Sequence, residues 1–458
     1  MNSRLKNFLA ESKEKASDLE LRRKINFTLK QSDDAFQKGK RQFFDFVAAR
    51  KKAKNIKWKA IESLDKYLEE FESKFIKSGG KVIWAENAQQ ALDEILKICR
   101  ARQAKTIVKS KSMVTEEIRL NQFLANHDID VIETDLGEYI QQLAGEPPYH
   151  IVAPAMHKSK EDVAQLFHDK LQVAPGLTPE QLTLVAREKL RQKFQDAEIG
   201  ITGVNFILAD IGGIAITENE GNAWLTGSFP KTHIAITGIE KVLASVNDLD
   251  LFWPLLATHG SGQNITTYNN IFTGPKQEGE VDGPEEMYVV LLDNGRTNIL
   301  SDTTSRESLY CIRCGACLNV CPVYKNIGGH AYKATYSGPI GSVITPYLMG
   351  LDEYKHLSYA STLCGSCTEI CPVHINLHGL LLNNRRKSVA EKHTSNSEKL
   401  TWYAWKKINL SRWVMNMTGG TIKNFIIQKL FKQSWGVNRE LPVFSRKSFN
   451  QLWKDQKK

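Results

Sequence analysis

Seven of the eight cysteines in this sequence lie between Cys311 and Cys371, and the first four have the spacing of iron–sulfur ligands. Residues 311–322 read "CIRCGACLNVCP", which is the C-x2-C-x2-C-x3-C-P run of cubane clusters. Three thiolates on a tight turn, each separated from the next by two residues, can face three corners of one cluster. The motif therefore predicts ligands for a [4Fe–4S] cluster.

The second cysteine motif is one ligand short. In "STLCGSCTEICPV", residues 361–373, Ser361 stands where the first cysteine would be. In two-cluster proteins the fourth cysteine of such a run binds the other cluster. This rule assigns Cys311, Cys314, Cys317 and Cys371 to cluster 1, and Cys321, Cys364 and Cys367 to cluster 2. Cluster 2 is then either [3Fe–4S], or [4Fe–4S] with one corner held by Ser361, a histidine, water or a partner.

Two other interpretations of the cysteines are weaker. A structural zinc site would favour two pairs of ligands with tetrahedral closure, and the four-cysteine run is more specific than a single C-x2-C. Buried structural cysteines would not need this spacing. The remaining cysteine, Cys99 in "EILKICRAR", is expected to be a small buried residue on an amphipathic helix.

Two polar stretches before the cysteines are candidates for a ligand pocket. "KSKSMVTEE", residues 109–117, follows a strand and opens a helix, so Lys109 and Lys111 could hold a carboxylate or phosphate there; the alternative is a helix cap with solvated lysines. "ADIGGIAITENEGN" places Glu218, Asn219 and Asn222 near glycines, as a polar pocket or a structural turn would. Neither G-x-G-x-x-G after a strand nor a Walker A loop is present, so no nucleotide site is predicted.

The pattern of apolar residues divides the chain into four segments. Residues 1–79 are predicted to be helical, and residues 80–300 alternate short apolar strands with helices, which predicts an α/β domain with a mostly parallel sheet. Residues 301–385 are predicted to be helical with Gly- and Pro-rich breaks. Residues 386–458 form a basic tail that holds five of the nine tryptophans.

Composition limits the class of protein. The net charge of +10 is dispersed, and no nucleic-acid motif is present, so nucleic acid is not an expected partner. No uncharged apolar run approaches the roughly 18 residues of a membrane span, and the N-terminus lacks the apolar region of a secretory signal. We therefore expect a cytoplasmic protein. The Trp-rich tail is expected to cover the cysteine region, or to contact a partner or an anionic membrane peripherally.

Several long stretches resemble one family. The segment "VKSKSMVTEEIRLNQFLANHDIDVIETDLGEYIQQLAGEPPYHIVAPAMHKSK", the stretch "GITGVNFILADIGGIAITENEGN" and both cysteine motifs are similar to lactate utilisation protein B. The resemblance implies a Rossmann-like LUD domain of the cyclo-ligase and isomerase type, a helical ferredoxin-like domain and a helical tail. The cysteine region is also similar to the helical ferredoxin domain of succinate dehydrogenase and fumarate reductase iron–sulfur subunits.

The resemblance also implies a function. Family members act in lactate utilisation with a cysteine-rich partner and a second LUD-domain partner, and this subunit is expected to carry electrons during oxidation of L-lactate to pyruvate rather than to catalyse the reaction alone. Two iron–sulfur clusters are implied, [4Fe–4S] for cluster 1 and [4Fe–4S] or [3Fe–4S] for cluster 2. The alternatives are an iron–sulfur redox sensor and a self-sufficient oxidoreductase with its site in the LUD domain.

Overall fold

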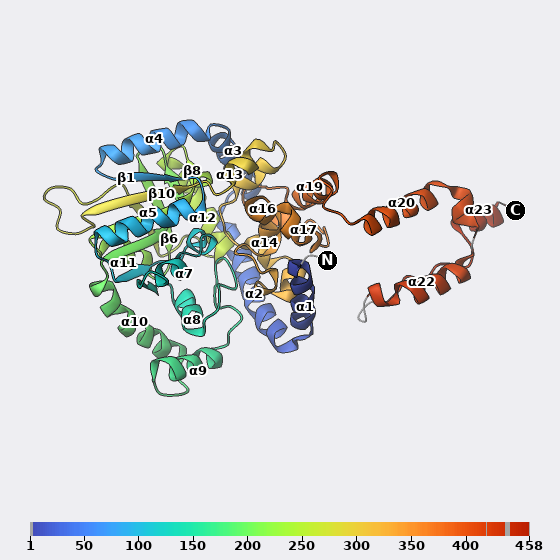
Figure 1. The fold of residues 1–458 in the computed structure, drawn as a ribbon, viewed down its shortest axis with the longest axis horizontal. Coiled ribbons are helices and arrows are strands. Elements are labelled where there is room, and N and C mark those ends of the chain that lie inside the picture. Colours follow the sequence, from blue (N-terminus) through green and yellow to red (C-terminus); the bar gives the residue numbers. More distant parts are fainter. Residues whose placement is uncertain (1–2, 418, 436–439, 458) are drawn as a thin grey trace. The chain divides into compact units, whose positions relative to one another are not determined.

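The computed structural model describes residues 3–417, 419–435 and 440–457. Two compact units are present, residues 1–387 and residues 388–458 (Figure 1). None of the helices in the described part of the chain combines the length and apolar character that crossing a bilayer requires.

The first unit is built around a six-stranded parallel sheet. Its strands are, in spatial order, β1 (Lys81–Ala85), β10 (Glu286–Leu292), β7 (Thr232–Gly238), β4 (Ile199–Gly203), β2 (Thr106–Lys109) and β3 (Asp130–Glu133). All five neighbouring pairs are parallel. The alternation of strands and helices therefore gives the α/β class that the sequence predicts; the more specific cyclo-ligase-like and ferredoxin-like folds stay predictions.

The two faces of this sheet are covered by different elements. Successive strand residues point to opposite faces, so Val290 packs with α5 (Ala88–Ala101), α6 (Met113–Glu117) and α7 (Leu120–Ala125) on one face. Val289 faces the main core on the other side. At the β2 and β3 end, this second face is covered by α8 (Leu136–Ala144), α9 (Lys160–Leu171) and α10 (Pro179–Asp196). Thr178 caps α10 in a capping box with Gln181, as the sequence predicts.

A smaller sheet lies in the main core. Its strands, in spatial order, are β8 (Val242–Leu243), β5 (Phe206–Leu208), β6 (Gly213–Glu218) and β9 (Tyr268–Phe272). Strand β6 runs antiparallel to both of its neighbours, β5 and β9. Helix α11 (Asn222–Ser228) follows β6, and α12 (Leu249–Gly260) follows β8.

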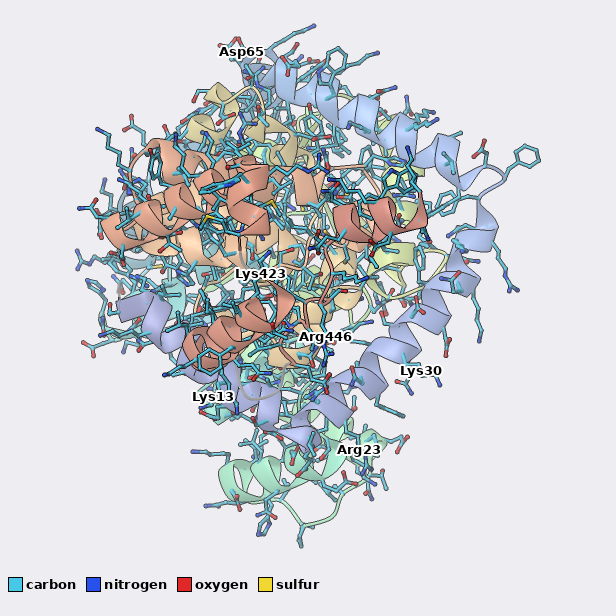
Figure 2. The ribbon with its side chains drawn as sticks, turned by 90° about the vertical axis from the view of Figure 1, so that its right-hand side faces the viewer. Lys13, Arg23, Lys30, Asp65, Lys423 and Arg446 are labelled. Atoms are coloured by element: carbon cyan, nitrogen blue, oxygen red, sulfur yellow. The ribbon has the colours of Figure 1, made fainter. Side chains whose placement is uncertain are left out.

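The N-terminal helices pack onto this core. They are α1 (Ser3–Ser17), α2 (Leu19–Gly39), α3 (Phe46–Glu62) and α4 (Leu64–Lys77). Phe71 and Phe75 of α4 are fully buried in the same cluster as Ile207 of the small sheet. The outer surface stays charged: Figure 2 labels Lys13, Arg23 and Lys30 on α1 and α2, and all three residues are exposed.

The cysteine region is helical and belongs to the first unit. It contains α13 (Arg296–Ser301), α14 (Ala316–Asn319), α15 (Pro322–Ile327), α16 (Gly338–Met349), α17 (Leu351–Tyr359), α18 (Ser366–Ile370) and α19 (Leu377–Ala390). Buried residues of this region, including Leu318 and Tyr324, share one core with α4 and the small sheet. The cysteines are therefore fixed against the α/β domain rather than carried on a separate module.

The second unit consists of α20 (Asn396–Leu410), α21 (Arg412–Asn416), α22 (Gly420–Trp435) and α23 (Phe449–Gln456). Helix α20 buries none of its residues. Trp402 and Trp405 are 60% and 58% exposed. Within the second unit, this helix therefore leaves large aromatic side chains uncovered.

Candidate metal centre and adjoining cavity

Four cysteines from the two sequence motifs surround one small cavity of about 20 Å³. They are Cys311, Cys314, Cys317 and Cys371. Gly315 makes the turn possible: its φ of +77° favours glycine, and a Cβ there would lie 2.9 Å from His150. The structure thus brings together the four residues that the crossover rule assigns to cluster 1.

The chemistry of this group suits an iron–sulfur cluster. Burial raises the pKa of Cys314 and Cys317, and raises that of Cys371 to about 12, so these thiols need a cation to become thiolates. Two backbone amides donate to sulfur, Arg313 N to Cys311 Sγ and Ile375 N to Cys371 Sγ, both at 3.4 Å. Four sulfur donors with N–H support are the ligand set that such clusters use.

The other three cysteines form a second group. Burial, together with the neighbouring Cys321 and Cys364, raises the pKa of Cys367 to about 11. Cys321 caps the start of α15, Cys367 lies in α18, and Cys364 is exposed. Ser361 Oγ accepts a hydrogen bond from Leu363 N at 3.1 Å. Helices α14 and α18 pack against each other, so the two cysteine groups are neighbours.

A larger cavity of about 300 Å³ lies at the carboxyl ends of the parallel strands. Ser110–Ser112 follow β2, Asp135 follows β3, and Lys241 follows β7. Ligands of open α/β sheets bind at such ends. The lining continues to Arg313 and Tyr336 of the cysteine region, so the cavity is shared by the α/β domain and the iron–sulfur region.

Four of the five residues predicted for a ligand pocket line this cavity, namely Lys111, Glu218, Asn219 and Asn222. Lys111 Nζ donates to the carbonyl of Val152 at 2.6 Å. Glu218 accepts from Ala223 N at 2.6 Å and Trp224 N at 2.7 Å, at the start of α11.

Lys109 differs from the prediction, because its side chain is fully buried and does not line the cavity. Its Nζ lies 2.9 Å from Glu133, 3.5 Å from Glu116 and 3.7 Å from Glu138. Lys109 and Glu133 are direct partners in the β2–β3 register. Three carboxylates therefore surround this ammonium, which leaves it no open side for an anionic ligand.

A buried network of charges lies between the cavity and the first cysteine group. Arg296 donates to Glu117 at 2.9 Å and 3.0 Å and to Glu240 at 2.7 Å. Arg313 Nη2 donates to the other oxygen of Glu240 at 3.3 Å, and its guanidinium lies 4.5 Å from the ring centroid of Tyr336. Although burial opposes ionisation of Glu240, the two arginines lower its pKa to about 2.

Sequence reasoning missed Lys241, Arg313 and Tyr336 as cavity residues. Arg313 lies inside the "CIRC" motif, whose spacing identifies only the cysteines. Lys241 follows the strand of "THIAITG". The rule that parallel strands collect functional residues at their carboxyl ends would have selected Lys241. Nothing local in the sequence would have selected Tyr336.

Comparison with protein families gives two matches. Residues 68–292 match the LUD domain, and residues 307–375 match the 4Fe-4S dicluster domain. With the gathered cysteines, the second match identifies an iron–sulfur protein.

Several relatives share one name. "Lactate utilization protein B" of Shouchella clausii is 41% identical over 418 residues, covering 89% of this chain and 88% of that protein. Those of Anoxybacillus flavithermus and Bacillus subtilis are 49% and 47% identical, covering 76% and 77% of this chain and 74% of each protein. Among solved structures, a DUF162 family protein from Deinococcus radiodurans is similar over 50% of this chain and 98% of that chain, at 14% identity and a TM-score of 0.29, too low to establish a shared fold.

Proposed function

The chain belongs to the lactate utilisation protein B family, and from this premise we propose that it is the iron–sulfur electron-transfer subunit of a complex that oxidises L-lactate to pyruvate. The observation that carries the proposal is the division of seven cysteines into a group of four and a group of three, each drawing residues from both motifs.

Cluster 1 is [4Fe–4S] and uses the four cysteines around the small cavity. Cluster 2 uses Cys321, Cys364 and Cys367, with its fourth corner held by Ser361 or another oxygen ligand, or absent in a [3Fe–4S] form. Two one-electron carriers side by side divide the two electrons of the oxidation. Because Cys364 is exposed, cluster 2 is the one from which electrons leave the chain.

The partners are a cysteine-rich subunit and a second LUD-domain subunit, and the complex works in the cytoplasm. Helix α20 supports a docking role, because within its own unit it buries none of its residues and leaves aromatic side chains uncovered. A protein partner is favoured over a membrane. If the isolated chain bound anionic lipid vesicles and a W402S/W405S variant did not, the membrane would be favoured instead.

A self-sufficient oxidoreductase is the second candidate, and one observation favours it. The 300 Å³ cavity is lined by Arg313, whose backbone nitrogen donates to Cys311 Sγ. A substrate bound there would lie beside cluster 1 without help from another subunit.

The test is anaerobic EPR with iron and sulfide quantitation on the reconstituted chain, alone and with the two partner subunits. We expect about eight irons for two [4Fe–4S] clusters, or about seven with a [3Fe–4S] cluster. L-lactate should reduce the clusters only when the partners are present. Reduction of the isolated chain by L-lactate would establish the second candidate, and a chain that holds no cluster would refute both.

A further inference from the structure

The cavity at the strand ends has a size that suits a small ligand. Its volume of about 300 Å³ lies at the lower end of the roughly 300–1,000 Å³ typical of ligand pockets. A small acid fits this volume better than a dinucleotide does.

One wall of the cavity carries positive charge that the protein does not neutralise. Lys241 is 6% exposed and lines the cavity, and no hydrogen-bond partner for its ammonium is found among the described residues. Arg313 lines the same wall; its Nη2 donates to Glu240, and its Nη1, which has no partner in the described structure, is enclosed away from the cavity space. A buried donor without a partner is costly, so Lys241 marks a place where an acceptor is missing, and Arg313 adds positive charge beside it.

The ion pairs behind this wall do not supply the missing acceptor. Glu117 and Glu240 are both engaged by Arg296, and Glu240 is shared with Arg313. Counting Lys57 and Lys241, the buried cations around Glu240 thus outnumber the two carboxylates.

The acidic residues of the cavity are held elsewhere. Glu218 accepts from two backbone amides of α11, and Asp135 caps α8 by accepting from Glu138 N. Glu220 Oε2 accepts from Leu136 N at 3.0 Å. None of the three is paired with Lys241 or Arg313 among the described residues. The cavity therefore has a basic side next to cluster 1 and a side of carboxylates bound to amides.

We propose that this cavity binds a small 2-hydroxy or 2-oxo monocarboxylic acid, with its carboxylate held by Lys241 and Arg313 beside the first cysteine group. The carboxylate site stands on the unpartnered ammonium of Lys241 and on the charge of Arg313 beside it; the choice of 2-hydroxy and 2-oxo acids rests on the proposed function. Guanidinium and ammonium donors give charge-assisted hydrogen bonds to a carboxylate.

A rival explanation is that these cations only balance the negative charge of cluster 1. Lys57 provides the matched control, because it is fully buried and also interacts electrostatically with Cys311. Its Nζ donates to the carbonyls of Glu240 and Val242, at 2.6 Å and 3.2 Å, and it does not line the cavity. A Lys57→Met variant therefore removes a cation near the cluster and leaves the cavity wall intact.

The experiment is anaerobic calorimetry of the cluster-loaded chain with L-lactate, pyruvate and the uncharged L-lactamide. We expect both acids to bind, and L-lactamide to bind at least about tenfold more weakly. Lys241→Met should weaken pyruvate binding by about tenfold or more at unchanged iron and sulfide content, while Lys57→Met binds as the wild type does.

Absence of acid binding, or equal binding of L-lactate and L-lactamide by the wild-type chain, would overturn the inference without depending on any variant's folding. Failure of the proposed function is separate, since it appears as missing clusters or as clusters that lactate does not reduce in the presence of the partners.

Discussion

The guanidinium of Arg50 donates to the backbone carbonyl of Cys371, from Nε at 3.1 Å and from Nη2 at 2.8 Å. Arg50 lies on α3, 321 positions before the cysteine in sequence, and is buried. It also donates to the carbonyl of Glu369. The loop that carries the last cysteine of the first group is therefore held by the N-terminal helices.

We predict that Arg50→Met lowers the occupancy of cluster 1, because two carbonyls of the loop lose their donor and Cys371 is no longer held in place. Iron per chain should fall from about eight toward about four. Arg50→Lys should give an intermediate iron content, since lysine keeps the positive charge but lacks the planar guanidinium that bonds both carbonyls. Lys54→Met is the control: Lys54, on the same helix, bonds Glu307 and the carbonyl of His374 instead. Full iron content in Arg50→Met would contradict this role.

The exchange of ligands between the motifs gives a second prediction. Cys371→Ser should remove the EPR signal of the cluster formed mainly by the first motif, because Cys371 lies with Cys311, Cys314 and Cys317. Cys321→Ser should instead remove the signal of the other cluster. Each variant should keep about half of the iron. If Cys371→Ser loses the same cluster as Cys321→Ser, the assignment is wrong.

The cysteine grouping could be predicted because ligand spacing is a local property of the sequence. The α/β class could be predicted for a similar reason, since strand and helix periodicities are local. The residues that support the site could not be predicted: Arg50, Arg296 and Tyr336 contact residues that lie 179 to 321 positions away in sequence. No pattern in the sequence pairs such residues.

Lys109 shows where local reasoning fails. It is the last residue of β2 and precedes the helix cap at Ser112, and the strand and the helix were both predicted correctly. Which residue its side chain meets depends on the strand that lies beside β2. That strand is β3, and it places Glu133 opposite Lys109. With the strand order known, Lys109 would have been predicted to pair with Glu133 rather than to bind an anionic ligand.

The carboxylates around Lys109 give a third prediction. Burial and the neighbouring Glu133 hold the pKa of Glu138 well above its usual range, so the protonated form is favoured. Glu138→Gln should therefore change the free energy of unfolding by less than about 1 kcal/mol. Glu133→Gln breaks the 2.9 Å pair with the buried Lys109 and should cost about 3–5 kcal/mol. Denaturant unfolding measures both, and a larger cost for Glu138→Gln would refute the protonation.

Buried histidines predict a fall in stability below neutral pH. Burial lowers the pKa of His233 to about 3 and that of His259 to about 4. Between their ordinary pKa of 6.5 and these values, the unfolded chain binds protons that the folded chain does not, so stability is lost as pH falls through this window. Each histidine contributes a slope of up to about 1.4 kcal/mol per pH unit.

The measurement is the thermal midpoint of the cluster-loaded chain between pH 7 and pH 5. His259→Gln should flatten the slope, whereas His168→Gln, at an exposed position on α9, should leave it unchanged. The explanation fails if His259→Gln has the wild-type slope.

A pair of glycines tests how tightly the cysteine region is held to the α/β domain. Gly328, after α15, has a φ of +69°, and a Cβ there would lie 1.5 Å from Tyr149 Oη. Gly176 has nearly the same φ, +71°, with nothing within 4 Å of the added atom. Gly176→Ala therefore measures the strain of a positive φ in open space, about 1–2 kcal/mol. Gly328→Ala adds the strain of its ψ of −174° and the collision with Tyr149, which no small shift relieves because Tyr149 is buried and its carbonyl accepts from Tyr324 Oη at 2.8 Å. We expect Gly328→Ala to be the more destabilising variant by at least about 2 kcal/mol, and to lose cluster 2 first, because Cys321 is the N-cap of α15.

Equal unfolding free energies for the two variants would show that the cysteine region moves freely against the α/β domain. The cavity wall formed by Arg313 would then not be fixed.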